Sequence, residues 1–144
     1  MVVLVVSILL AVSLPITSSL AGRFRVGSAR DVFVNAYARA RAAAIQYGRE
    51  GRLQIRAAEG RFWVEVDTGG PGAVATDTIG RVVDVFDEYT GVTMFSPRQV
   101  LCFDSRGLSY SGGLCEPHDA EIIFSRADRA DTVQLSLGGT VVRR

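Results

Sequence analysis

The first sixteen residues of the chain are almost entirely apolar. They read MVVLVVSILLAVSLPI, with only Ser7 and Ser13 as polar side chains, and the first charged residue is Arg23. A bilayer core of about 30 Å needs about 20 apolar residues in a helix, so this run is slightly short unless residues 17–21 extend it. The pattern therefore predicts a hydrophobic helical stem over residues 1–22.

Three interpretations of this stem are open. In a secretory signal peptide, 19–21 (Ser-Leu-Ala) would be the cleavage site, but the usual basic residues before the apolar run are missing. In a buried core helix, so apolar a run would have to fit inside a small domain, which is rare. We favour a membrane anchor that continues into the domain, because a membrane helix tolerates a kink at Pro15. The residues expected in the membrane are Val2, Val3, Leu4, Val5, Val6, Ile8, Leu9, Leu10, Val12, Leu14 and Pro15.

A helical pattern of apolar residues resumes at about Ser28, in an alanine-rich segment. Apolar positions recur at intervals of three and four residues and form one stripe, while most arginines lie off it. Gly48 or Gly51 is a suitable C-terminal stop. Residues 23–51 are thus expected to be the amphipathic continuation of one long helix that is kinked at Pro15. The stripe consists of Phe33, Tyr37, Ala40, Ala44 and Tyr47.

Beyond Gly51 the period changes from helical to the two-residue alternation of strands. Residues 68–80 read as a loop rich in Gly and Pro, and Gly138-Gly139 reads as a two-residue hairpin turn. A helix followed by short antiparallel strands predicts an α+β fold, with residues 52–144 as a β-rich head domain. The predicted strands are 53–57, 62–67, 81–86, 91–95, 99–103, 120–124, 132–137 and 140–143.

Charge is distributed unevenly along the chain. The net charge is only +1, which argues against a nucleic-acid coat protein. Residues 22–61 carry nine Arg and three acids, net +6, whereas residues 62–144 carry seven Arg and twelve acids, net −5. All sixteen basic residues are Arg, which indicates either a GC-rich genome or bidentate binding of carboxylates and phosphates. One hypothesis is that Arg39 and Arg41 meet the acidic face of a neighbouring subunit.

The sequence contains no nucleophile elbow, P-loop or zinc-protease motif, and we expect no catalytic residue and no cofactor. The single histidine, His118, is expected to be a solvated turn residue. Cys102 and Cys115 form a disulfide by default if the domain lies outside the cytoplasm. Two alternatives are a metal site that adds His118, which lacks a fourth ligand, and two free buried cysteines.

Several segments together resemble the type IV pilins and type II secretion pseudopilins of the GspH/FimT type. The stem VVLVVSILLAVSLP resembles their hydrophobic N-terminal helix, which runs to a proline. The alanine-rich stretch 39–45, the segment FDSRGL at 103–108 and the closing VQLSLGGTVVRR follow in the family's order. The resemblance covers nearly the whole chain, and the order of its segments makes it moderately specific.

The resemblance implies a single-pass inner-membrane protein with its head in the periplasm. Its stem would pack with those of other pilins or pseudopilins in the core of a fibre. The family's basic leader, cleavage-site glycine, N-methylated aromatic residue and nearby glutamate are not found in this sequence. Aligning the proline places the leader and about six or seven mature residues upstream of Met1, where prepilin peptidase would act.

Three functional classes follow. The first is a minor structural subunit of a secretion pseudopilus or type IV pilus. The second is a subunit whose head binds extracellular DNA, with Arg143 and Arg144 on the phosphates, although stacking aromatics are not evident there. The third is a secreted periplasmic protein, which would have a mature N-terminus near Gly22.

Overall fold

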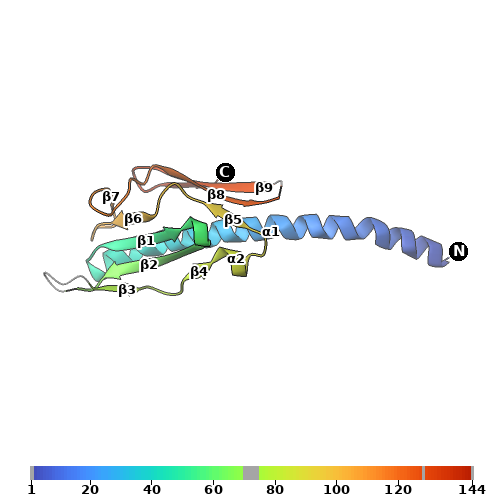
Figure 1. Ribbon diagram of the computed structural model, residues 1–144, viewed down its shortest axis with the longest axis horizontal. Coiled ribbons are helices and arrows are strands. Elements are labelled where there is room, and N and C mark those ends of the chain that lie inside the picture. Colours follow the sequence, from blue (N-terminus) through green and yellow to red (C-terminus); the bar gives the residue numbers. More distant parts are fainter. Residues whose placement is uncertain (1, 70–74, 128, 144) are drawn as a thin grey trace.

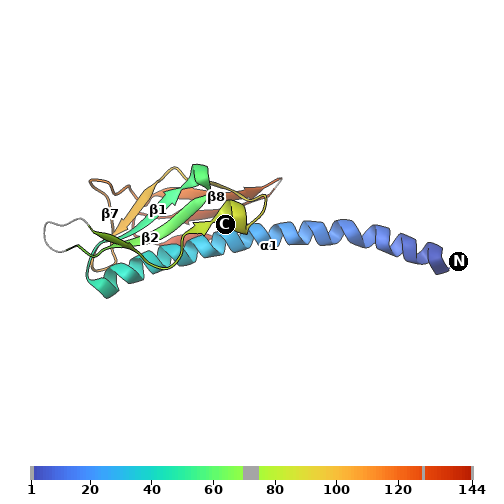
Figure 2. The ribbon, with the colours of Figure 1, turned by 60° about the horizontal axis from the view of Figure 1, so that its bottom comes forward.

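The computed structural model describes residues 2–69, 75–127 and 129–143, with side chains described from residue 24 to residue 142 outside those gaps. Helix α1 (Val2–Tyr47) is continuous through Pro15 and Gly22. Its C-terminal half lies along one face of two β-sheets, and its N-terminal half projects beyond them (Figures 1 and 2). The predicted α+β fold, a long helix on antiparallel strands, is confirmed.

The C-terminal half of α1 buries one stripe of small and aromatic side chains at intervals of three and four residues. The helix ends at Tyr47, followed by Gly48 with a φ of +61°. The amides of Gly48 and Arg49 donate to the carbonyls of Ile45 and Ala44, which is the Schellman pattern of C-capping. Tyr47 is 49% exposed, so its predicted place in the stripe is wrong. The buried residues are Val26, Ala29, Phe33, Ala36, Tyr37, Ala40, Ala43 and Ala44.

The first sheet has the antiparallel strand order β3-β2-β1-β6-β7, and β4 also pairs with β2. Its inner face packs on α1. At Gly51 a methyl group would lie 2.5 Å from the carbonyl oxygen of Ala40, so only glycine permits this approach of strand to helix. The strands are β1 (Gly51–Arg56), β2 (Arg61–Asp67), β3 (Thr76–Thr78), β4 (Val83–Asp84), β6 (Val100–Phe103) and β7 (Ser109–Tyr110).

The second sheet has the antiparallel order β10-β9-β8-β5. It comprises β5 (Thr93–Phe95), β8 (Ala120–Arg126), β9 (Arg129–Leu135) and β10 (Val141–Arg143). The turn between β9 and β10 is longer than predicted: the Ser136 amide donates to the Thr140 carbonyl, which leaves a three-residue loop. Of its two glycines only Gly139 has positive φ, as in a type I turn followed by a left-handed residue.

Other local predictions need correction. The predicted strand 81–86 is only the short β4, because the Asp84 carboxylate accepts from the amides of Phe86 and Asp87 and starts the single-turn helix α2 (Val85–Glu88). The predicted loop 68–80 contains β3, which pairs with β2. A 3-10 turn, η1 (Ala57–Glu59), joins β1 to β2.

The core lies between α1 and the two sheets, because the helix packs on β1, β2 and β6 of the first sheet and on β8 and β9 of the second. Phe33 is fully buried between Phe62 of β2, with ring centroids 5.3 Å apart, and Phe124 of β8, at 5.7 Å. One helix side chain therefore holds both sheets. Such aromatic contacts add about 0.5–1.5 kcal/mol beyond the apolar area that they bury.

Candidate functional site

A buried polar junction connects α1 to the first sheet. Tyr37 and His118 are each 2% exposed, and the Tyr37 hydroxyl lies 2.8 Å from Nδ1 of His118. Nε2 of His118 lies 2.9 Å from the carbonyl oxygen of Cys102. A carbonyl only accepts, so Nε2–H donates to it and Nδ1 accepts from the tyrosine O–H.

Burial sets the protonation of this pair. It lowers the pKa of His118, although the bond to the Cys102 carbonyl acts in the opposite direction. It raises the pKa of Tyr37 to about 12, with the Arg41 charge opposing the change. Both groups are therefore neutral at pH 7. His118 was predicted to be a solvated turn residue, and this is wrong. Because both ring nitrogens are engaged inside the protein, the ring offers no general base to a substrate at the surface.

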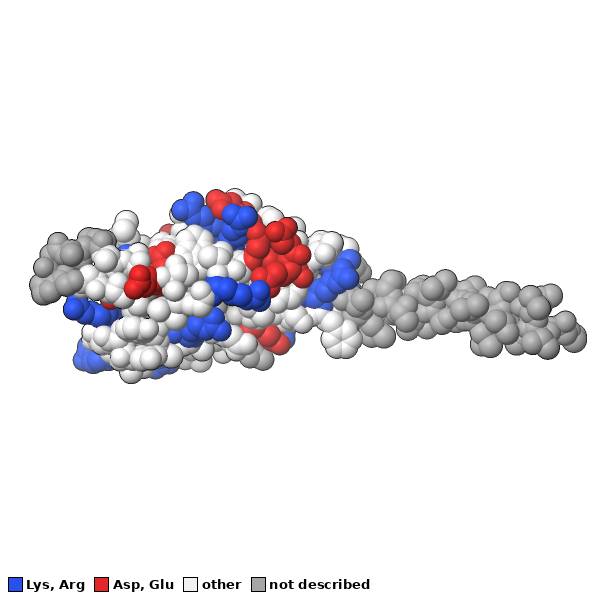
Figure 3. Space-filling view, turned by 90° about the horizontal axis from the view of Figure 1, so that it is seen from below, with Lys and Arg blue, Asp and Glu red and all other residues white. Residues whose placement is uncertain are grey.

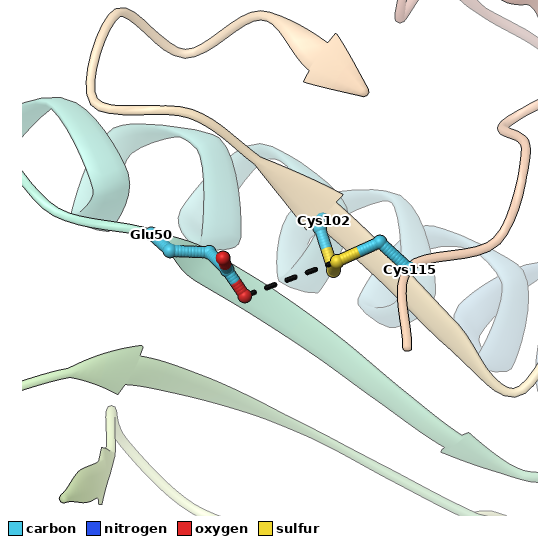
Figure 4. Close-up of side chains that lie close together, drawn as sticks. All are labelled: Glu50, Cys102 and Cys115. Carbon is cyan, nitrogen blue, oxygen red and sulfur yellow. Dashed lines mark hydrogen bonds between the residues drawn. A yellow bond between two sulfur atoms is a disulfide. The ribbon is translucent and has the colours of Figure 1, made fainter. Parts of the chain in front are cut away.

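The disulfide joins Cys102 of β6 to Cys115 in the β7–β8 connection, with the Cα atoms 5.5 Å apart. It fixes the loop that carries His118 against the sheet. Glu50 lies beside it, and Figure 4 shows its carboxylate directed toward the sulfur of Cys115, which it approaches to 3.8 Å. A disulfide sulfur carries no hydrogen, so the approach of the carboxylate to Cys115 is a van der Waals contact and not a hydrogen bond.

Glu50 takes its hydrogen bonds from two other groups. The Tyr110 hydroxyl and Nε of Arg52 donate to its two carboxylate oxygens. Burial raises the pKa of Tyr110, and the bond to the Glu50 carboxylate raises it further. The network ties β7 to the start of β1. No sequence pattern indicates this network, because Glu50 and Tyr110 are sixty residues apart.

Glu50, Cys102 and Cys115 are close enough to surround a metal ion. Their chemistry does not suit one, because a metal requires thiolates and both sulfurs are consumed in the disulfide. The predicted alternative with His118 fails for the same reason and because both nitrogens of His118 are hydrogen-bonded. The oxidised protein therefore uses these residues as a structural cross-link.

The stem residues, from Val2 to Pro15, lie in the backbone of α1, but their side chains fall outside the described part. No helix is both long and apolar enough to cross a membrane within the part of the chain searched, which is the described part. The backbone of Arg143, in β10, pairs with Val133 of β9. The side chain of Arg143 and the whole of Arg144 lie outside the described residues. The predicted membrane and DNA contacts therefore remain predictions.

The structure separates the two helix arginines that the charge hypothesis treats as a pair. The guanidinium of Arg39 lies over Gly80, between β3 and β4, whereas the stem of Arg41 lies over Gly107, in the β6–β7 turn. Both side chains are exposed. Arg39 and Arg41 thus face different edges of the first sheet.

A long N-terminal helix whose C-terminal half packs into a head of short antiparallel strands defines the pilin-like α+β fold. Solved structures place the chain among pilins and pseudopilins in fold. The type IV minor pilin FimU of Pseudomonas aeruginosa matches with a TM-score of 0.63 at 16% sequence identity, over 85% of this chain and 90% of that one. The minor pseudopilin EpsH from the type 2 secretion system of Vibrio cholerae matches with a TM-score of 0.58 at 15% identity, over 81% and 93%.

These matches rest on shape, because no protein-family model and no curated protein matches the sequence. The resemblance seen in the sequence is confirmed at the level of the fold. At sequence identities of 15–16%, these matches show a shared fold and nothing further about this chain.

Proposed function

We propose that this chain is a structural, non-catalytic subunit of a type IV pilus or type II secretion pseudopilus. The carrying observation is helix α1, which is anchored in the head by its C-terminal half and projects from it by its N-terminal half (Figure 1). Such a helix can pack with the helices of other subunits while the head remains outside the bundle. The minor-pilin and minor-pseudopilin neighbours in fold support this proposal.

In this proposal residues 1–22 are the membrane and fibre stem, 23–51 the amphipathic helix and 52–144 the head. The stem holds the subunit in the inner membrane, with the head in the periplasm, until it enters the fibre. Other pilins or pseudopilins are its partners. If a leader precedes Met1, prepilin peptidase removes it and N-methylation follows.

The test is incorporation of a tagged full-length chain into isolated fibres. Leu9→Asp in the stem should weaken membrane association about a hundredfold and reduce incorporation accordingly, since an acidic residue in the middle of a membrane helix costs about 2.5–3.5 kcal/mol. Leu114→Asp is the matched control, because Leu114 is 78% exposed on the head. A soluble mature protein that begins near Gly22 would contradict the proposal and support the cleaved signal peptide.

DNA binding by the head is the alternative, and no contact of a described residue favours it. It is tested by measuring the affinity of the full-length chain for DNA against salt concentration. The loss of Arg143 and Arg144 should weaken binding and reduce the salt dependence. No binding at low salt, or binding unchanged in the variant, would exclude this alternative.

A further inference from the structure

A small crease opens where helix α1 meets the β4 edge of the first sheet. It encloses about 170 Å³, and its walls include the buried side chains of Phe62 and Val83. Asn35 and Arg39, one helical turn apart on α1, line it from one side, and Arg81 lines it from the other. The crease thus combines an apolar wall with amide and guanidinium donors.

The two arginines of the crease differ in whether an acidic side chain neutralises them. Arg81 forms a bidentate ion pair with Glu88 of α2, with N–O distances of 2.9 and 2.8 Å. Arg39 has no ion pair or hydrogen bond from its side chain among the described residues. A methyl group at Gly80 would lie 2.8 Å from Nη1 of Arg39, so the glycine makes room for this guanidinium. One uncompensated positive charge therefore stands at the crease.

Figure 3 views the molecule from the side on which β3, β4 and α2 lie in Figure 1. Basic and acidic side chains both gather on this face, and some basic groups stand apart from the acidic ones. Because the Arg39 side chain is exposed, an acidic group from outside the molecule can reach its charge.

The size and charge of the crease indicate its ligand. Its volume is below the about 300–1,000 Å³ of small-molecule sites, so it suits one side chain and not a nucleotide. A guanidinium binds carboxylates through two parallel hydrogen bonds, and the apolar wall would contact the methylenes of the same side chain. We propose that the crease binds an Asp or Glu side chain of a neighbouring subunit's head. This inference rests on the proposed function as a fibre subunit.

Arg41 provides a matched control within the same helix. It has the same charge and is also exposed, but a methyl group at Gly107 would lie 3.1 Å from its Cγ, which places it over the β6–β7 turn. It does not line the crease. A general effect of helix charge would affect both arginines equally, whereas the proposed site requires only Arg39.

The first experiment measures binding directly, in the full-length chain in detergent micelles. The probe is N-acetyl-glutamate amide, and NMR follows the side-chain amide of Asn35 and the backbone amide of Gly80. We expect saturable shifts in the wild type and in Arg41→Ala, and affinity weaker by about tenfold or more in Arg39→Ala. The neutral N-acetyl-glutamine amide should cause no saturable shift. Equal binding of the neutral probe, unchanged affinity in Arg39→Ala, or tighter binding of inorganic phosphate would overturn the proposal.

The second experiment measures assembly. Arg39→Glu should lower the amount of the chain in isolated fibres about tenfold, whereas Arg41→Glu should leave it near the wild-type level. Arg39→Gln, which keeps the length of a polar side chain without its charge, guards against a folding defect and should also reduce incorporation. Equal loss in Arg39→Glu and Arg41→Glu would overturn the site. A wild-type chain that never enters fibres would instead refute the proposed function, while the binding of the small probe would stand unaffected.

Discussion

The substitution Phe33→Ala tests whether one helix side chain holds the two sheets together. Phe33 is fully buried, and its ring packs on Phe62 of the first sheet and Phe124 of the second. Removing such a ring typically costs about 3–5 kcal/mol, since the cavity left behind collapses only partly. A domain of this size has about 5–15 kcal/mol of stability in total, so the loss is a large fraction. With a urea dependence of about 2 kcal/mol per molar, the midpoint should fall by about 2 M.

The assay is urea unfolding of the full-length chain in detergent, followed by the fluorescence of Trp63 on β2. The matched control is Phe24→Ala, on the same helix but at a side chain that is 73% exposed. The control should change the free energy of unfolding by less than about 0.5 kcal/mol. If Phe33→Ala costs no more than Phe24→Ala, the helix does not hold the sheets as described, and the account of the core is wrong.

Three further predictions concern the head. Burial lowers the pKa of His118 below its ordinary 6.5, so the folded state binds this proton less readily than the unfolded state. The free energy of unfolding should therefore fall as the pH drops below 6.5, and it should fall less in His118→Asn, as measured by unfolding at pH 7.5 and pH 5. Reduction of the Cys102–Cys115 disulfide should cost about 3 kcal/mol in unfolding with and without reductant, and a double Cys→Ala variant should not respond to reductant. Gly51→Ala should destabilise by about 1–3 kcal/mol because of its clash with α1, unlike Gly138→Ala, whose new methyl group would meet nothing closer than 3.9 Å.

The helix could be predicted from the sequence, because its buried stripe repeats over several turns. Phe33, Tyr37, Ala40 and Ala44 are all buried as expected. The stripe fails only at its end, where Tyr47 is exposed and the Gly48 cap ends the helix. The longer strands β2 and β8 were predicted for the same reason, since several alternating residues determine one face.

The shortest elements could not be predicted. Strands β4 and β7 have two residues each, too few to show any period, and β3 is exposed throughout, so it has no buried face to detect. They exist because longer neighbouring strands offer them hydrogen bonds. The strand pattern of residues 81–86 predicts one strand, yet the Asp84 cap starts α2 directly after the two-residue β4.

The junction of Tyr37 with His118 shows why the site was less predictable than the fold. The partners are 81 residues apart, and the second partner of His118 is a backbone carbonyl, which has no sequence signature. Only the cysteine pair indicated that the chain near residue 118 is held against the sheet.

The structure also changes the meaning of the basic N-terminal half. Much of its charge is neutralised inside the subunit: Arg30 pairs with Asp131, Arg52 with Glu50, and Arg61 with Asp84. Arg30 thus joins the helix to β9, Arg61 joins β2 to β4, and the Arg52–Glu50 pair is local to the start of β1. Among the described side chains of this half, the guanidinium groups that lack an ion pair all lie on α1 or just after it. They are Arg25, Arg39, Arg41 and Arg49.

Two of these unpaired charges, Arg39 and Arg41, lie on opposite flanks of the helix. Arg39 lies on the flank toward β4 and Arg41 on the flank toward β7. A subunit that packs through its helix would present these flanks to different neighbours, because one partner cannot cover both sides of a helix that is buried in its own head. Charge reversal at Arg39, which lines the crease, should therefore lower incorporation, whereas the same change at Arg41 should leave incorporation near the wild-type level. A single shared phenotype would mean that net charge, and not position, governs the contact.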